Sequence, residues 1–261
     1  MIKKIAVALL IFLMPQSLPA FEQSMLSLKV PTNLQVKDGE FRILHRFIGV
    51  FHDRTFDTAM GMTEGAHVNL GIRYHIWSKL EANISYLTRE KEIIAGAGYA
   101  YLLPQAYLRS QLDAQFFSYD PGTGNRQNNF FGLFSLQSEP IFKRVAPVLN
   151  LGYDGDNHRF GLGLGVSIIL IKKFELIGEY YPVYRDDSNP NVKTKNAFAF
   201  GFKDNTAGHH FMLLFTNSWA SEPRHMMLGT GTRIQSGTDL YFGFNIERWF
   251  NLDEFIPGGE G

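Results

Sequence analysis

The chain has no cysteine, so a disulfide framework is excluded and the fold must be held by hydrogen bonds and packing. After residue 20 no apolar run approaches the roughly 20 residues that a membrane-spanning helix needs. Acidic and basic residues balance at 25 each and form no basic stripe, which argues against a nucleic-acid-binding protein. The chain also lacks Pro/Ser linkers and low-complexity tracts, which favours a single folded domain.

What is abundant points to β-sheet. The sequence has 23 Phe, 11 Tyr and 25 Gly, a combination that fits strands better than helices. Residues 1–20 are the exception, because Lys3 and Lys4 precede an apolar run that ends near Ala20, as in a secretory signal peptide. We therefore predict a signal peptide over 1–20, an N-terminal periplasmic segment over 21–40, a barrel over 41–250 and a C-terminal tail over 251–261.

Alternation of apolar and polar residues recurs along the chain and predicts about twelve antiparallel strands. In the clearest case, Val68, Leu70 and Ile72 share one face while Asn69 and Arg73 share the other. The predicted strands cover residues 41–51, 67–77, 79–88, 92–103, 105–118, 129–141, 145–153, 158–171, 174–185, 196–203, 209–219 and 238–250.

The connections tend to alternate in length, with long ones such as 52–66 and short ones such as Ser78 alone. Long loops on one rim, with short turns and both termini on the other, are typical of an up-and-down outer-membrane β-barrel. About eight strands can enclose a core of side chains, whereas about twelve leave a lumen too wide for an ordinary apolar core. We therefore predict an all-β transmembrane barrel whose apolar face meets lipid. A two-sheet sandwich is the structural alternative.

On this interpretation the polar face lines the lumen, where opposite charges can pair and glycines leave room for long side chains. Several aromatic residues fall on the apolar face near strand ends, as in an interfacial girdle. The candidate lumen residues are Arg73, His75, Glu81, Arg109, Asp113, Arg159, Glu175 and Glu179.

The end of the chain resembles a known family. "TNSWASEPRHMMLGTG" followed by "DLYFGFNIERWF" is similar to the closing segment of an uncharacterised family of bacterial outer-membrane-like β-barrels, a domain of unknown function. "GAHVNLGIRYHIWSKLEANISYLTREKEIIAGAGYAYLLPQ" resembles its central hairpins. The resemblance implies fold and location, and no catalytic residue. The closing-strand motif, which we expect to serve barrel assembly, comprises Gly243, Phe244, Asn245, Ile246, Arg248 and Phe250.

Two clusters invite a chemical interpretation. His209, His210, Ser218, Glu222 and His225 contain the residue types of a hydrolase, but His210 and Ser218 lie about 26 Å apart along one predicted strand. The acidic stretch 154–158 is better explained as a hairpin turn than as a metal site. Glycine-rich stretches such as 160–166 do not open a helix and so do not predict a nucleotide loop.

We expect a small-solute pore or ligand-selective channel in the bacterial outer membrane. The alternative is a non-conducting structural or binding barrel whose lumen is plugged by paired charges, and a lipid hydrolase is less favoured. We expect no enzyme activity, cofactor or metal. The expected partners are outer-membrane lipid, the barrel assembly machinery and small solutes, with no nucleic acid; the oligomeric state stays open.

Overall fold

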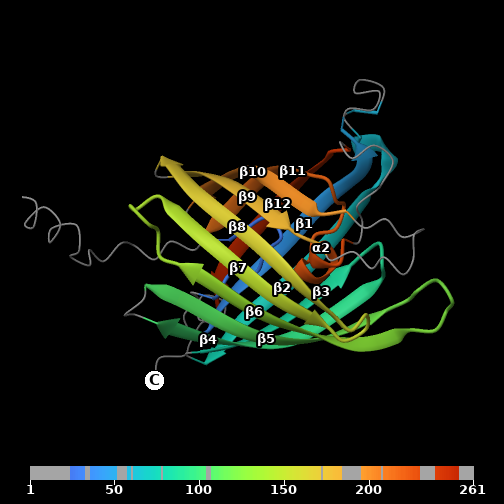
Figure 1. Ribbon diagram of the computed structural model, residues 1–261, viewed down its shortest axis with the longest axis horizontal. Coiled ribbons are helices and arrows are strands. Elements are labelled where there is room, and N and C mark those ends of the chain that lie inside the picture. Colours follow the sequence, from blue (N-terminus) through green and yellow to red (C-terminus); the bar gives the residue numbers. More distant parts are fainter. Residues whose placement is uncertain are drawn as a thin grey trace, which may run out of the picture.

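The structure is a computed structural model that describes residues 24–32, 36–51, 58–59, 61–77, 79–103, 107–171, 173–183, 195–206, 208–229 and 239–252. The predicted signal peptide and all of the predicted tail beyond residue 252 lie outside these ranges. Twelve antiparallel strands close into one barrel in which each strand pairs with its sequence neighbours and β1 pairs with β12. Figure 1 shows the strands tilted around the barrel, with α2 inside the ring toward the end at which the β5–β6 connection projects.

All twelve predicted strands are present, within a few residues of the predicted bounds. They are β1 (Asp38–Val50), β2 (Ala66–Trp77), β3 (Leu80–Leu87), β4 (Glu92–Leu103), β5 (Leu108–Tyr119), β6 (Gln127–Ser138), β7 (Val145–Asp154), β8 (Arg159–Ile171), β9 (Phe174–Tyr181), β10 (Ala197–Thr206), β11 (His209–Thr216) and β12 (Tyr241–Asn251). Two short helices, η1 (Met62–Glu64) and α2 (Pro223–Met227), lie in the β1–β2 and β11–β12 connections. The up-and-down barrel is therefore confirmed, and the sandwich is excluded.

The two rims differ in the way the alternation of loop lengths predicts. β1 begins and β12 ends at one rim, which also carries the β2–β3, β8–β9 and β10–β11 turns and is called the turn rim here. The opposite rim, called the loop rim, carries the long β1–β2 and β11–β12 connections. No helix among the described residues is long and apolar enough to cross a membrane.

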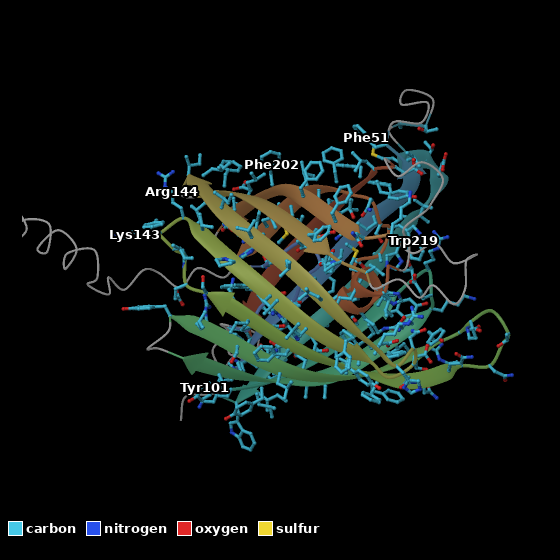
Figure 2. All side chains as sticks on the ribbon, viewed as in Figure 1. Phe51, Tyr101, Lys143, Arg144, Phe202 and Trp219 are labelled. Atoms are coloured by element: carbon cyan, nitrogen blue, oxygen red, sulfur yellow. The ribbon has the colours of Figure 1, made fainter. Side chains whose placement is uncertain are left out.

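The outer face of the barrel is apolar and the inner face is polar. Leu112 and Phe160 on the outer face are 63% and 80% exposed, whereas Glu81 and Asp113 on the inner face are almost completely buried. Tyr101 and Phe202 lie on the outside of the barrel in Figure 2. An apolar outer surface of this extent requires a lipid environment, since soluble proteins rarely expose large contiguous apolar patches.

The inner face of β8 carries a row of glycines at Gly161, Gly163 and Gly165, where the chain needs space. A Cβ atom on Gly163 would lie 2.5 Å from Cδ2 of Leu28, and one on Gly161 would lie 2.5 Å from Cβ of Met227. Both neighbours belong to segments that enter the barrel from outside the sheet. The predicted role of these glycines, leaving room in the lumen, is thus confirmed, and the chain itself fills that room.

Replacing Gly163 by Ala should lower the free energy of unfolding by about 1 to 3 kcal/mol, because the new methyl group overlaps Leu28 and Tyr181. Urea unfolding of the protein in detergent micelles measures the change. Gly132→Ala is the matched control, since nothing lies within 4 Å of a Cβ atom built there. An equal loss in both variants would contradict the packing explanation.

Candidate functional site

The lumen contains an N-terminal plug, defined here as residues 24–32. All nine of these residues are buried, and their backbone groups bond to inward-facing side chains. The Glu179 carboxylate accepts hydrogen bonds from the amides of Ser27 at 2.9 Å and Leu28 at 3.1 Å. Asn150 accepts from the Lys29 amide at 2.9 Å and donates to the Lys29 carbonyl at 2.7 Å. Barrel side chains therefore replace the sheet partners that this segment lacks.

This position differs from the periplasmic segment that we predicted over 21–40. Residues 24–32 lie inside the barrel, and β1 already begins at Asp38. The buried apolar cluster includes Met25, Leu26 and Leu28. Burial of their apolar surface favours the entry of this segment into the lumen.

Three buried cations tie the plug to the wall. Lys29 Nζ lies 2.8 Å from a carboxylate oxygen of Glu81 and 2.8 Å from one of Asp113. Arg46 donates to the carbonyl of Leu26 at 3.0 Å. Lys203 Nζ donates to the Ser24 carbonyl at 3.2 Å and pairs with Glu175 at 3.0 Å, again inside the barrel. The plug is thus held by ion pairs as well as by apolar packing.

A second segment fills the loop-rim half of the lumen. This loop plug, defined here as residues 218–229, contains α2 and is buried apart from the half-buried Trp219 and Leu228. Arg224 Nη2 donates to both carboxylate oxygens of Glu92, at 2.7 and 2.8 Å, and its Nη1 lies 3.5 Å from Asp154. His225 Nε2 lies 2.9 Å from Glu92. Asn69 on β2 donates to Glu222, which joins the plug to a further strand of the wall.

Both plugs line one cavity of the lumen. A polar cavity of about 30 Å³, enough for one or two water molecules, lies between them. Its lining includes Ser27 and Lys29 of the N-terminal plug, Glu222 and Pro223 of the loop plug, and Arg42 and Arg73 of the wall.

A serine, a histidine and a carboxylate meet near the loop rim. His67 Nε2 lies 3.2 Å from Ser221 Oγ, and His67 Nδ1 lies 3.3 Å from Glu90 Oε2. His67 and Ser221 are buried, and the Glu90 side chain is 14% exposed. Burial raises the pKa of the Glu90 carboxyl above its ordinary value, and the neighbouring His225 charge opposes that rise.

The structure places the predicted lumen residues on the inner face. Arg73 bonds Glu40 and lies 3.9 Å from Glu81, while Arg109 lies 3.3 Å from Glu139 at the turn rim. Arg159 faces inward at the loop rim, paired in register with Asp154, and His75 is buried on β2. Glu81, Asp113, Glu175 and Glu179 meet the N-terminal plug or its cationic partners. Only some of the predicted lumen residues therefore surround the N-terminal plug, and the others lie elsewhere on the inner face.

Sequence reasoning missed the groups that complete these contacts. Lys29, Arg46, Lys203 and Arg224 supply the positive charges, and His67 and Ser221 form the rim pair. The inward parity of His67, Arg46 and Lys203 in their strands was the available signal. Nothing in the alternation pattern marks Lys29 or Arg224, because both lie outside the strands.

The closing-strand motif joins the barrel and the plug. Asn245 donates to the Leu26 carbonyl at 2.8 Å and accepts from Arg46 at 2.7 Å. Gly243 gives the Arg46 side chain room, because a Cβ atom there would lie 2.9 Å from Arg46 Cδ. Phe244 stacks on His45 with ring centroids 4.6 Å apart. Ile246 and Arg248 share the lipid-facing parity, and Phe250 pairs with Gly39 across the closing seam.

The residues first considered for chemistry do not form one cluster. His210 Nδ1 pairs with Ser24 at 3.0 Å, whereas Ser218 Oγ accepts from the Ala220 amide at 3.1 Å. In the 154–158 turn, the amide and the side chain of Asn157 both donate to Asp154, as expected for a hairpin turn. The described part of the chain contains no group of three His, Cys, Asp or Glu residues placed to hold a metal ion.

These features define a membrane-bound β-barrel with a filled lumen. Residues 127–250 match the model of a family described as "Membrane bound beta barrel domain (DUF5777)". The resemblance predicted from the closing segment is therefore confirmed, while the central hairpins lie outside the matched residues.

Other comparisons concern the fold alone. The chain is similar to the Acinetobacter baumannii outer membrane protein Omp33, with 8% identity and a TM-score of 0.46, over 83% of this chain and 100% of that one. It is also similar to outer membrane phospholipase A from Escherichia coli, with 9% identity and a TM-score of 0.47, over 85% of this chain and 94% of that one. No curated protein matches the sequence.

Proposed function

We propose that this chain is a bacterial outer-membrane β-barrel whose lumen is closed by its own plugs and which does not conduct solutes in its resting state. Its role would be that of a rigid scaffold that binds through its loop rim. The observation that supports this proposal best is the burial of residues 24–32 and 218–229 inside the barrel, where both segments contact inward-facing side chains of the wall.

The charges of the lumen support the closed state. A selective pore needs binding groups that face an open path. Here Glu81 and Asp113 neutralise Lys29, and Glu92 neutralises Arg224, so these groups hold plugs in place. The pore expected from the strand count alone would require both plugs to leave together.

Planar-bilayer recordings test this proposal. The purified full-length protein should show no steady conductance, whereas a variant that lacks residues 24–32 and carries a short Gly/Ser link in place of 218–229 should conduct. Each single removal should leave the lumen largely blocked, because the other plug remains. Heat-modifiable migration on gels verifies that every variant is folded. Steady conductance of the unmodified, folded protein would refute the closed barrel.

A further inference from the structure

Three elements of the loop rim bring Ser221, His67 and Glu90 together. Ser221 lies in the loop plug, His67 begins the inner face of β2, and Glu90 lies in the β3–β4 connection. The hydroxyl and the carboxylate approach opposite nitrogens of one imidazole, at 3.2 Å on Nε2 and 3.3 Å on Nδ1. These separations are close to hydrogen-bonding distance and fit the looser geometry common in such sites before a substrate binds.

This order of groups suits an activated serine. An imidazole whose Nδ1 faces a carboxylate is held with Nε2 free to accept the proton of a hydroxyl. The carboxylate then stabilises the imidazolium that forms when the serine attacks. The same three roles recur on unrelated folds and are recognised by geometry.

The lumen contains a second buried Ser–His pair that lacks this arrangement. Ser24 Oγ lies 3.0 Å from His210 Nδ1, and the carboxylate of Glu247 approaches that same nitrogen at 3.9 Å. Hydroxyl and acid therefore compete for one side of the ring. This pair provides an internal comparison for the rim site.

Ser221 is buried beneath side chains of the loop rim. Trp219 packs edge-on against His67 with ring centroids 5.5 Å apart, and the exposed Arg89 guanidinium lies 4.2 Å from the Trp219 ring centroid. The site thus lies one layer of side chains below the rim, and Figure 2 places Trp219 at that end of the barrel. Neighbouring Glu222, which bonds Asn69, makes the vicinity of Ser221 polar.

We propose that Ser221 is a nucleophile toward carboxylic esters that arrive from the aqueous rim. Ser221 Oγ bonds to the acyl carbon while its proton passes to His67 Nε2. The ester C–O bond breaks, and the alcohol leaves with that proton. Water, activated by His67, then hydrolyses the acyl-serine and restores the hydroxyl. Ser221 and His67 are the catalytic residues, and Glu90 is a positioning residue.

A fluorophosphonate probe tests this on the folded, full-length protein in detergent micelles. Mass spectrometry of the labelled wild-type protein should locate the probe on Ser221, a result that needs no variant to fold. Ser221→Ala should abolish labelling, and His67→Gln should slow it by about 10²- to 10⁴-fold through loss of the general base. Hydrolysis of p-nitrophenyl butyrate should fall in parallel.

Ser24→Ala is the matched control, since it removes a hydroxyl from the other buried Ser–His pair and should leave the labelling rate unchanged. Glu90→Gln should slow labelling and shift its pH profile, which a purely structural carboxylate would not do. Absence of labelling in folded wild-type protein, or labelling of a different serine, would overturn the proposal. Conductance is a separate readout, so the closed barrel and the esterase site can fail independently.

Discussion

Replacing Lys29 by Met should destabilise the docked N-terminal plug by about 3 to 5 kcal/mol, because it leaves Asp113 buried without its cation and leaves Glu81 with only the Arg73 guanidinium, 3.9 Å away. Both carboxylate side chains are shielded from solvent, so water cannot take over the role of the ammonium group. Methionine preserves the apolar stem, which confines the change mainly to the charge.

A cysteine probe measures the release of the plug directly. The chain has no cysteine, so Val30→Cys introduces a single reactive thiol at a buried plug position. Maleimide should label this thiol about 100- to 4,000-fold faster when Lys29 is also replaced, since each 1.4 kcal/mol changes an equilibrium tenfold. Adding Glu81→Gln and Asp113→Asn should restore part of the protection.

Lys79→Met is the matched control for the loss of a lysine. Lys79 is exposed and lies 5.1 Å from the Tyr101 ring centroid, a contact worth about 0.5 to 1 kcal/mol at such a site. Its replacement should not change the labelling rate of the Val30→Cys thiol. Equal rates with and without Lys29 would show that the ion pairs do not hold the plug.

The strands could be predicted from the sequence because their signal is local. In β2 successive side chains point to opposite faces of the sheet. Leu70 and Ile72 therefore face outward and Asn69 and Arg73 face inward, and no other part of the chain is needed to predict this. The barrel followed from the number of strands and the alternation of loop lengths. Both arguments depend on geometry that a strand imposes on its neighbours.

The contents of the lumen could not be predicted in the same way. Lys29 meets Glu81 from 52 residues away, and His67 meets Ser221 from 154 residues away. The N-terminal plug has no strand-like periodic pattern, because its backbone is satisfied by side chains such as Glu179 instead of by a sheet. The loop plug contains only the five-residue helix α2, which is too short to show a helical period. The glycine row in β8 indicated space inside the barrel, but it did not indicate which segment of the chain fills that space.

The two plugs are held at different depths by the same arrangement of ion pairs. Each inserts one cation between two carboxylates of the wall: Lys29 between Glu81 and Asp113, and Arg224 between Glu92 and Asp154. A buried carboxylate without a partner is strongly unfavourable, so the wall itself requires the plugs. The charges of the barrel wall therefore stabilise the closed state, as its packing does.

Replacing Arg224 by Met should lower the free energy of unfolding by about 3 to 5 kcal/mol and release the loop plug. Arg224 pairs with Glu92 and Asp154, both fully buried, and its guanidinium lies 3.8 Å from the Phe117 ring centroid. Urea unfolding measures the loss, and Trp219 fluorescence reports release because this tryptophan belongs to the loop plug.

Arg126→Met is the matched control, since Arg126 is exposed and hydrogen-bonds only Ser118 and Lys91 among the contacts described for it. Its loss should change stability by less than about 1 kcal/mol, as is usual for interactions of exposed charges. Adding Glu92→Gln to Arg224→Met should recover part of the loss, because the unpaired charge is then removed. If Arg224→Met behaved like Arg126→Met, the ion pairs of Arg224 with Glu92 and Asp154 would have no part in closing this half of the lumen.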